Sequence, residues 1–367
     1  MIKCELFSYS TSDHSTLIHT AFGLLAAKGE IQLTYNFKFY SRFGKTPLKH
    51  IDPYDLQGVF VVINQEKTIF YDTSDAEGLF EDVLEVSDLY FKRSYRKSAI
   101  PEQHQKKVFP LGLNYQVYAG MFDRREFYRL FFSTRNYRKS PKELIKWLLR
   151  NTLIKYNPTI KNMHFPPQPE QEPRVLFMAR TWDADNCPYP IPDDFKEVWR
   201  RDCTNVNESR AGVIRILRKE LGDRFYGGFS QSSYTSKHYK DALLDDNSVS
   251  RKGNYMKILR KHPICIATTG LHNSIGWKFA EYVAFSKAIV SEKLYFSVPG
   301  NLEAGKNYLE FNNTEECVKQ TLKLFEDKTL RAQMMQDNYE YYEKYLSPDK
   351  IILRTLNIAL HPEHAKF

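Results

Sequence analysis

The chain has 367 residues, a formal net charge of +9 and a pI near 9.0. Its length suggests two domains, and its hydrophobic content of 42% and aromatic content of 14% exclude a disordered chain. No stretch approaches the run of about eighteen apolar residues that predicts a membrane-spanning helix. The five scattered cysteines contain no C-x-x-C, which disfavours a disulfide framework or a structural zinc site and favours a cytoplasmic location.

The first half alternates short apolar runs with helical patterns. We expect a strand at 4–7, a polar loop at 8–15 and a helix at 16–28. Further strands are expected at 58–63, 68–71, 88–91 and 107–111. This alternation predicts a first α/β domain over residues 1–165.

Positive charge concentrates between residues 124 and 161, where eleven Lys and Arg face two Glu. Apolar side chains are interleaved with these cations, and residues 142–156 have helical spacing after the start signal Ser140-Pro141. Three interpretations remain open: a solvated helix face, a patch for an anionic membrane surface, and a nucleic-acid groove. The residues of this acceptor or membrane patch are Arg135, Arg138, Lys139, Lys142, Lys146 and Arg150.

Four prolines within residues 164–173 mark a linker, placed at 166–173, and a second α/β domain is expected over 174–347. Its expected strands are 174–178, 224–226, 263–268 and 288–291, and its expected helices are 209–221 and 276–285. Residues 348–367 contain a last helix that we expect to cross back to the first domain. The alternation predicts parallel sheets, with a ligand cleft at the carboxyl ends of their strands.

The most informative segment runs from Thr268 to Tyr282, where a buried strand ends, a Gly-rich polar turn follows and a helix begins. A helix start offers unpaired backbone N–H groups and a partial positive charge, which suit a phosphate. Lys278, in the first turn, opposes the helix dipole and therefore suits an anionic ligand. Glu281 shares its face and suits sugar hydroxyls beside a diphosphate. The alternative interpretation is a surface Lys–Glu pair.

Four short motifs follow one another in this half. They are Gly276-Trp277-Lys278-x-x-Glu281-Tyr282, Ser286-Lys287-Ala288-Ile289-Val290, Val298-Pro299-Gly300 and Gly305-x-Asn307-Tyr308. In this order they resemble the nucleotide-sugar half of GT-B glycosyltransferases, especially bacterial cell-surface polysaccharide enzymes and exostosin-like or group 1-like relatives. The resemblance covers residues 174–348. It implies an α/β protein with two Rossmann-like domains facing across a cleft, the first binding the acceptor and the second the nucleotide sugar.

The resemblance also implies roles for single residues. Glu281 would hold the ribose of the donor, while Lys278 and Arg180 would neutralise its diphosphate. The full donor-binding set is Arg180, Gly228, Asn273, Ser274, Gly276, Lys278 and Glu281.

Asn273 departs from the family pattern, because retaining members carry a glutamate eight residues before the ribose carboxylate. The departure favours an inverting reaction, which needs a base in the first half. Asp13 and His14 are the catalytic candidates, with Asp72 and Asp75 as rivals and a polar surface loop as the alternative. Lys92 and Arg93 are consecutive, so at most one of them faces the cleft.

The implied function is transfer of a sugar from a nucleoside-diphosphate sugar to a glycan or lipid-linked acceptor at the inner face of a cell membrane. No cofactor or essential metal is expected, because Asp183-Ala184-Asp185 is interpreted as a chance D-x-D. Three alternatives remain open. They are a DNA-modifying glycosyltransferase that uses the basic stretch, a non-catalytic sugar- or nucleic-acid-binding protein, and an epimerase of the same fold.

Overall fold

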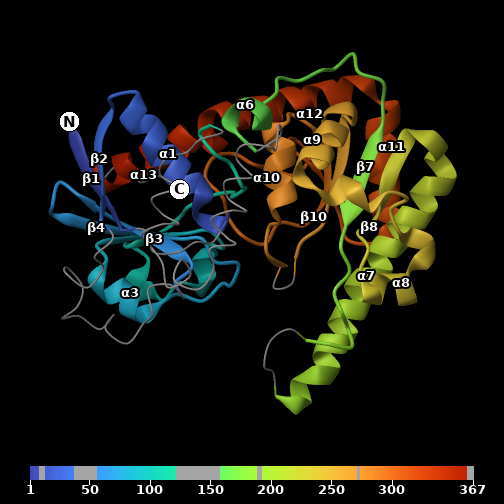
Figure 1. Cartoon of the computed structure of the whole chain (residues 1–367), viewed down its shortest axis with the longest axis horizontal. Coiled ribbons are helices and arrows are strands. Elements are labelled where there is room, and N and C mark those ends of the chain that lie inside the picture. The colour runs from blue at the N-terminus through green and yellow to red at the C-terminus, as the bar shows by residue number, and fades with distance from the viewer. Residues whose placement is uncertain (8–12, 37–55, 121–157, 188–191, 271–272, 362–367) are drawn as a thin grey trace, which may run out of the picture.

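The structure is a computed structural model that describes residues 1–7, 13–36, 56–120, 158–187, 192–270 and 273–361. Two α/β halves, each built on one sheet, lie beside each other (Figure 1). The predicted α/β class with two Rossmann-like sheets is confirmed. Within the described ranges, no helix has the length and apolar character that crossing a bilayer requires.

The first half is built on a six-stranded sheet with the strand order β2-β1-β3-β4-β5-β6. Its elements are β1 (Ile2–Phe7), α1 (Thr16–Ala27), β2 (Ile31–Asn36), β3 (Gly58–Ile63), β4 (Lys67–Asp72), α3 (Glu81–Val86), β5 (Leu89–Lys92) and β6 (Val108–Pro110). The sheet has the expected parallel pairs β1–β2, β4–β5 and β5–β6, but β3 runs antiparallel to both β1 and β4. Asn64 and Gln65, with φ of 51° and 64°, form the tight turn that returns the chain from β3 to β4.

The second half is built on a five-stranded, wholly parallel sheet with the order β11-β10-β9-β7-β8. After α6 (Ile160–Met163), its elements are β7 (Val175–Ala179), α7 (Asp193–Leu221), β8 (Phe225–Phe229), α8 (Ser233–His238), α9 (Lys252–Lys261), β9 (Ile264–Ala267), α10 (Trp277–Ala284), β10 (Ala288–Glu292), β11 (Leu309–Phe311), α11 (Thr314–Glu326), α12 (Lys328–Tyr341) and α13 (Pro348–Leu360).

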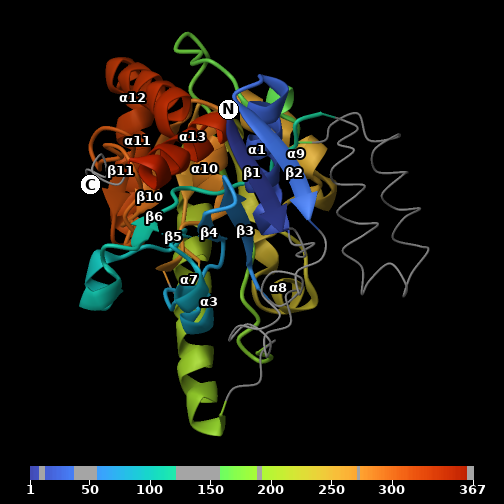
Figure 2. The ribbon, with the colours of Figure 1, turned by 90° about the vertical axis from the view of Figure 1, so that its left-hand side faces the viewer.

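The helix expected at 209–221 is much longer in the structure, where α7 begins at Asp193. Its first turns project from the body of the protein (Figure 2) and carry exposed side chains such as Phe195. An element without a neighbour to pack against needs no apolar stripe. The periodicity that reveals a buried helix is therefore weak there.

The strand order of the second sheet creates a crevice. From β7 the chain moves to β8 on one side, and then returns to β9 on the other side of β7. The segments that follow β7 and β9 therefore diverge at the carboxyl ends of these two strands. In open α/β sheets this switch point is where ligands bind.

A single apolar cluster continues through both halves and includes Phe22 of α1, Tyr115, Phe279 of α10 and Ile352 of α13. Each sheet also has a second cluster on its other face. α13 lies against α1, where Asp349 pairs with Lys28 at 2.6 Å. The last helix is thus part of the packing of the first half.

Candidate functional site

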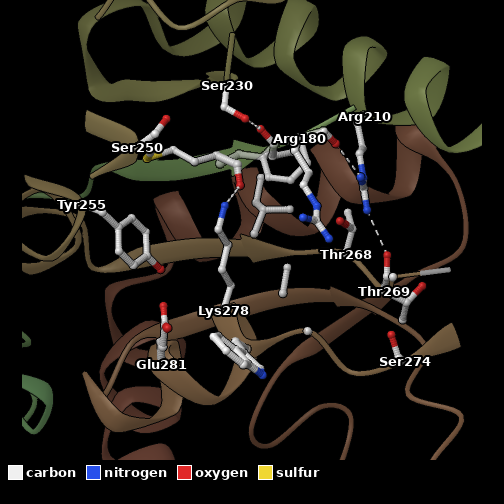
Figure 3. A pocket seen from close by; sticks show the side chains of 18 of the residues that line it. Arg180, Arg210, Ser230, Ser250, Tyr255, Thr268, Thr269, Ser274, Lys278 and Glu281 are labelled. Atoms are coloured by element: carbon white, nitrogen blue, oxygen red, sulfur yellow. Dashed lines mark hydrogen bonds between the residues drawn. The ribbon is translucent and has the colours of Figure 1, made fainter. Parts of the chain in front are cut away.

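A cavity of about 720 Å³ opens between the two halves at the switch point (Figure 3). The second half lines it with the ends of β7 and β9, the turn after β9, the start of α10, and residues of α7 and α9. The first half contributes His14, Asp75, Arg93 and Gln116. Five cationic side chains line the cavity against two carboxylates: Arg93, Arg180, Arg210, Lys252 and Lys278 against Asp75 and Glu281.

The turn between β9 and α10 has a tight backbone that its sequence explains. The Gly270 N–H donates to the Ser274 carbonyl at 2.9 Å, and a Cβ at Gly270 would lie only 2.7 Å from the Ser274 hydroxyl. Asn273 has a φ of 57°, a left-handed conformation that Asn adopts more readily than most residues. Gly276 then precedes α10, whose N-terminus has no capping side-chain hydrogen bond. The start of α10 is therefore available to an anion.

Lys278 lies inside the cluster of cations. Its Nζ donates to the carbonyl of Met178 at the end of β7 (Figure 3). Burial lowers the pKa of Lys278 to about 8, and the cations of Arg210, Lys252 and Arg180 act in the same direction, while Glu281 opposes them. A bound anion would relieve this repulsion.

Two arginines flank the lysine. Arg210 of α7 is buried and donates to the carbonyls of Arg180 at 2.8 Å and Thr269 at 3.0 Å, which joins the segments after β7 and β9. Burial lowers the pKa of Arg210 to about 10. The Arg180 guanidinium lies 4.8 Å from the centre of the Trp182 ring, a cation–π contact. Among the described residues, Arg210 Nε and Trp277 Nε1 are buried donors without a partner, and both residues line the cavity.

Glu281 lies on α10, one turn after Lys278. It is 2% exposed and forms an ion pair with Lys252 of α9. Tyr255, also on α9, points its hydroxyl toward the Glu281 carboxylate (Figure 3). Burial holds the pKa of Tyr255 well above its ordinary value, so the phenol stays neutral.

Arg93 brings the first half to the cavity. Its Nη2 donates to the carbonyl of Ile275 at 2.9 Å, and its Nη1 pairs with Asp75 and lies 3.1 Å from His14 Nδ1. The His14 ring packs edge-on against Trp277, with 4.7 Å between ring centres. Burial and the Arg93 cation lower the pKa of His14. The neighbouring Lys92 turns the other way into a buried pair with Asp72 at 2.9 Å, so only one of the two consecutive cations faces the cavity.

The structure brings six residues of the sequence-based set to the cavity, and three lie elsewhere. The six are His14, Arg180, Ser274, Gly276, Lys278 and Glu281. Asp13 is exposed and does not line the cavity, and its carboxylate accepts a bond from the Tyr118 hydroxyl at 3.4 Å. Gly228 packs under the chain, since a Cβ there would lie 2.8 Å from the Leu244 nitrogen. Asn273 is exposed and shapes the turn.

Sequence reasoning missed Arg210, Lys252 and Trp277. Arg210 lies within the helix expected at 209–221, to whose residues no role was assigned, and Lys252 begins a helix that was not expected. Trp277 lies beside Lys278 in the motif that begins at Gly276, but no role was assigned to it. The patch from Arg135 to Arg150 lies outside the described residues. Within the described residues, no group of three or more His, Cys, Asp or Glu side chains is placed to hold a metal ion.

No family model and no curated protein matches the chain. The structure is similar to proteins with the GT-B fold, a fold shared by nucleotide-sugar glycosyltransferases and UDP-N-acetylglucosamine 2-epimerases. A TarM mutant from S. aureus in complex with UDP matches at 17% identity and a TM-score of 0.35, over 60% of this chain and 42% of that chain. HepE from Anabaena in complex with UDP matches at 12% identity and a TM-score of 0.36, over 96% of this chain and 99% of that chain.

A putative UDP-N-acetylglucosamine 2-epimerase from Listeria monocytogenes matches at 13% identity and a TM-score of 0.39, over 78% of this chain and 63% of that chain. The matched region thus spans less than half of TarM and less than two thirds of the epimerase. Likenesses of this strength describe the course of the chain and carry no argument about substrate or reaction.

Proposed function

We propose that this protein transfers a sugar from a nucleoside-diphosphate sugar to a hydroxyl group of a glycan or lipid-linked acceptor. One observation carries the proposal. The uncapped start of α10 and three cations converge on one side of a cavity whose other side presents ionisable groups of the first half. A group-transfer site needs this division between a leaving-group side and an acceptor side.

The charge of the site supports a diphosphate leaving group. Within the part of the chain that the structure describes, Arg180, Arg210 and Lys278 form no ion pair with a carboxylate, although Glu281 acts electrostatically on Lys278 and Glu292 acts on Arg210. A diphosphate diester carries two negative charges, and a nucleoside diphosphate near neutral pH carries about three. Three cations therefore match the departing nucleoside diphosphate better than the intact donor. Stabilising charge that develops as a bond breaks is what lowers the barrier.

Glu281 supports recognition of the nucleoside. Its carboxylate is buried and one oxygen is held by Lys252, which fixes the orientation of the other. A fixed carboxylate oxygen accepts hydrogen bonds from vicinal ribose hydroxyls. The distance along α10 from Lys278 to Glu281, about one turn, suits a diphosphate at one end and a ribose at the other.

The acceptor side is proposed to face a membrane-bound or anionic acceptor at the inner surface of the cell membrane. This part of the proposal rests on the amino-acid sequence of residues 124–161, with its excess of Lys and Arg.

The first experiment is a thermal-shift screen of the full chain with UDP, GDP, CMP and dTDP and their sugars. We expect one nucleotide family to raise the melting temperature. At a nucleotide concentration of about 100 times Kd, binding stabilises the folded protein by about 2.7 kcal/mol. Release of that nucleoside diphosphate is then followed with and without a hydroxyl acceptor such as an oligosaccharide or a polyprenyl-linked glycan. Acceptor-dependent release supports transfer. Conversion of the sugar nucleotide without any acceptor identifies an epimerase instead, and no shift with any nucleotide contradicts the donor site.

A further inference from the structure

Three aspartates of the first half were candidates for the base, Asp13, Asp72 and Asp75, and their surroundings in the structure differ. Asp72 is fully buried, and its oxygens accept bonds from Lys92, the Tyr90 hydroxyl and the Ser74 N–H. Asp13 does not line the cavity. Asp75 lines it, and its side chain is 48% exposed. Of these three, only Asp75 has an exposed carboxylate that lines the cavity.

Arg93 holds Asp75 against the donor side. One guanidinium pairs with Asp75 through Nη1 and donates to the Ile275 carbonyl through Nη2 at 2.9 Å. Ile275 immediately precedes Gly276, the residue before the start of α10. The side chain of Arg93 is only 5% exposed, so this bridge is a fixed part of the site. The Arg93 guanidinium therefore lies between the Asp75 carboxylate and the backbone of Ile275, which leads into the proposed diphosphate site.

His14 lies beside the same guanidinium and is less suited to accept a proton. A guanidinium only donates hydrogen bonds, so its contact with His14 Nδ1 at 3.1 Å requires Nδ1 to be unprotonated. A proton gained by this ring would add a second positive charge next to Arg93. We therefore expect His14, which packs on Trp277, to line the cavity as an uncharged ring.

We propose that the Asp75 carboxylate is the general base that activates the acceptor hydroxyl. This inference rests on the proposed function. The acceptor O–H proton passes to the Asp75 carboxylate as the acceptor oxygen forms a bond to the anomeric carbon. The bond from that carbon to the diphosphate oxygen breaks, and its electron pair leaves with the nucleoside diphosphate. The charged and titratable groups that face Asp75 are Arg93 and His14, with Asp72 behind Arg93.

The test compares Asp75→Asn with a matched control, Glu77→Gln. Glu77 is an ion-paired carboxylate two residues away, bound by Arg96, and it does not line the cavity. We expect Asp75→Asn to lower kcat about 100- to 10,000-fold, the usual contribution of a general base, while the nucleotide Kd stays within about threefold. Glu77→Gln is expected to keep both kcat and Kd.

A second variant, Asp75→Ala, is assayed with added formate. Formate supplies a carboxylate of the size that was removed, so transfer should rise with its concentration. Transfer by Asp75→Asn within tenfold of the wild type, or loss of activity only in His14→Asn, would overturn the proposal for Asp75. Failure of the wild type to transfer any sugar contradicts the proposed function instead, so the two failures are distinguishable.

Discussion

Several cations surround Lys278. We therefore predict that replacing this lysine raises the stability of the free protein and weakens nucleotide binding. The pKa of Lys278 falls from 10.5 to about 8 in the folded protein. This fall corresponds to about 3 kcal/mol of destabilisation of the folded state at pH 7, where the amine is charged in both folded and unfolded chains. Replacement by methionine removes this cost but also the bond from the charged amine to the Met178 carbonyl, worth about 1.5 kcal/mol. Lys278→Met should therefore stabilise the free protein by about 1.5 kcal/mol, or ~2 °C in Tm for a chain of this length.

The pH dependence of this gain follows from the same values. Between about pH 8 and 10.5 the unfolded chain binds more protons than the folded one, so wild-type stability rises with pH through this range. The advantage of Lys278→Met should be largest below pH 8 and should disappear towards pH 10.5. Urea unfolding at pH 7, 8.5 and 10 measures the difference directly.

Nucleotide binding should change the other way. Loss of a charge-assisted bond costs about 1.5–3 kcal/mol, which is ~10- to 100-fold in Kd. A nucleotide concentration that stabilises the wild type by about 2.7 kcal/mol would then stabilise Lys278→Met by only about 0.4 kcal/mol if Kd is 100-fold weaker.

The chain offers a matched control in Lys287, whose pKa is also lowered to about 8 by burial and whose Nζ donates to the Arg260 carbonyl at 3.2 Å, away from the cavity. Lys287→Met should raise Tm without altering the nucleotide shift. A Lys278→Met protein that is less stable than the wild type and keeps its full nucleotide shift would refute the reasoning.

Three further predictions concern the same site. Because the nucleoside diphosphate is expected to bind the charged form of Lys278, its Kd should weaken as pH rises through about 8, and this step should vanish in Lys278→Arg; a flat titration calorimetry profile between pH 7 and 9 would contradict it. Glu281→Gln should bind the preferred nucleoside diphosphate and its 2′,3′-dideoxy analogue equally, whereas the wild type prefers the former about tenfold or more; an unchanged preference removes the ribose role. Asn273→Gly should keep both stability and nucleotide affinity, while Asn273→Val should lose about 1–2 kcal/mol in urea unfolding because valine strains a φ of 57°; equal stability of the two variants would exclude a purely conformational role.

Elements with a buried face were predictable from the sequence, because a buried face requires apolar residues at regular spacing. The strand expected at 58–63 agrees with β3 at both ends, and the last helix expected within 348–367 is α13. The exposed start of α7 left no such pattern. The turn between the antiparallel strands β3 and β4 requires positive φ angles at Asn64 and Gln65. The sequence there lacks the Asn-Gly pair that is typical of such a turn.

The part of the site built on one turn and one helix was more predictable than the part contributed by distant elements, for a geometric reason. Ser274, Gly276, Lys278 and Glu281 lie on one turn and one helix, so local spacing brings them together. Arg210 and Arg93 reach the cavity from distant elements, by bonds to backbone carbonyls of Thr269 and Ile275. Such bonds depend on tertiary packing and leave no trace in residue spacing.

The position of α13 has a consequence for the order in which the protein assembles during synthesis. A nascent chain emerges from the ribosome amino end first, and domains usually fold as they emerge. Here the helix that lies against α1, and whose Thr355 hydroxyl meets the Tyr71 hydroxyl at 2.8 Å, follows the second half in the chain. The sheet of the first half is therefore made before α13. Part of its apolar surface stays uncovered until nearly all of the second half has been translated. Translation of the second half thus sets the time during which the first half needs protection from aggregation.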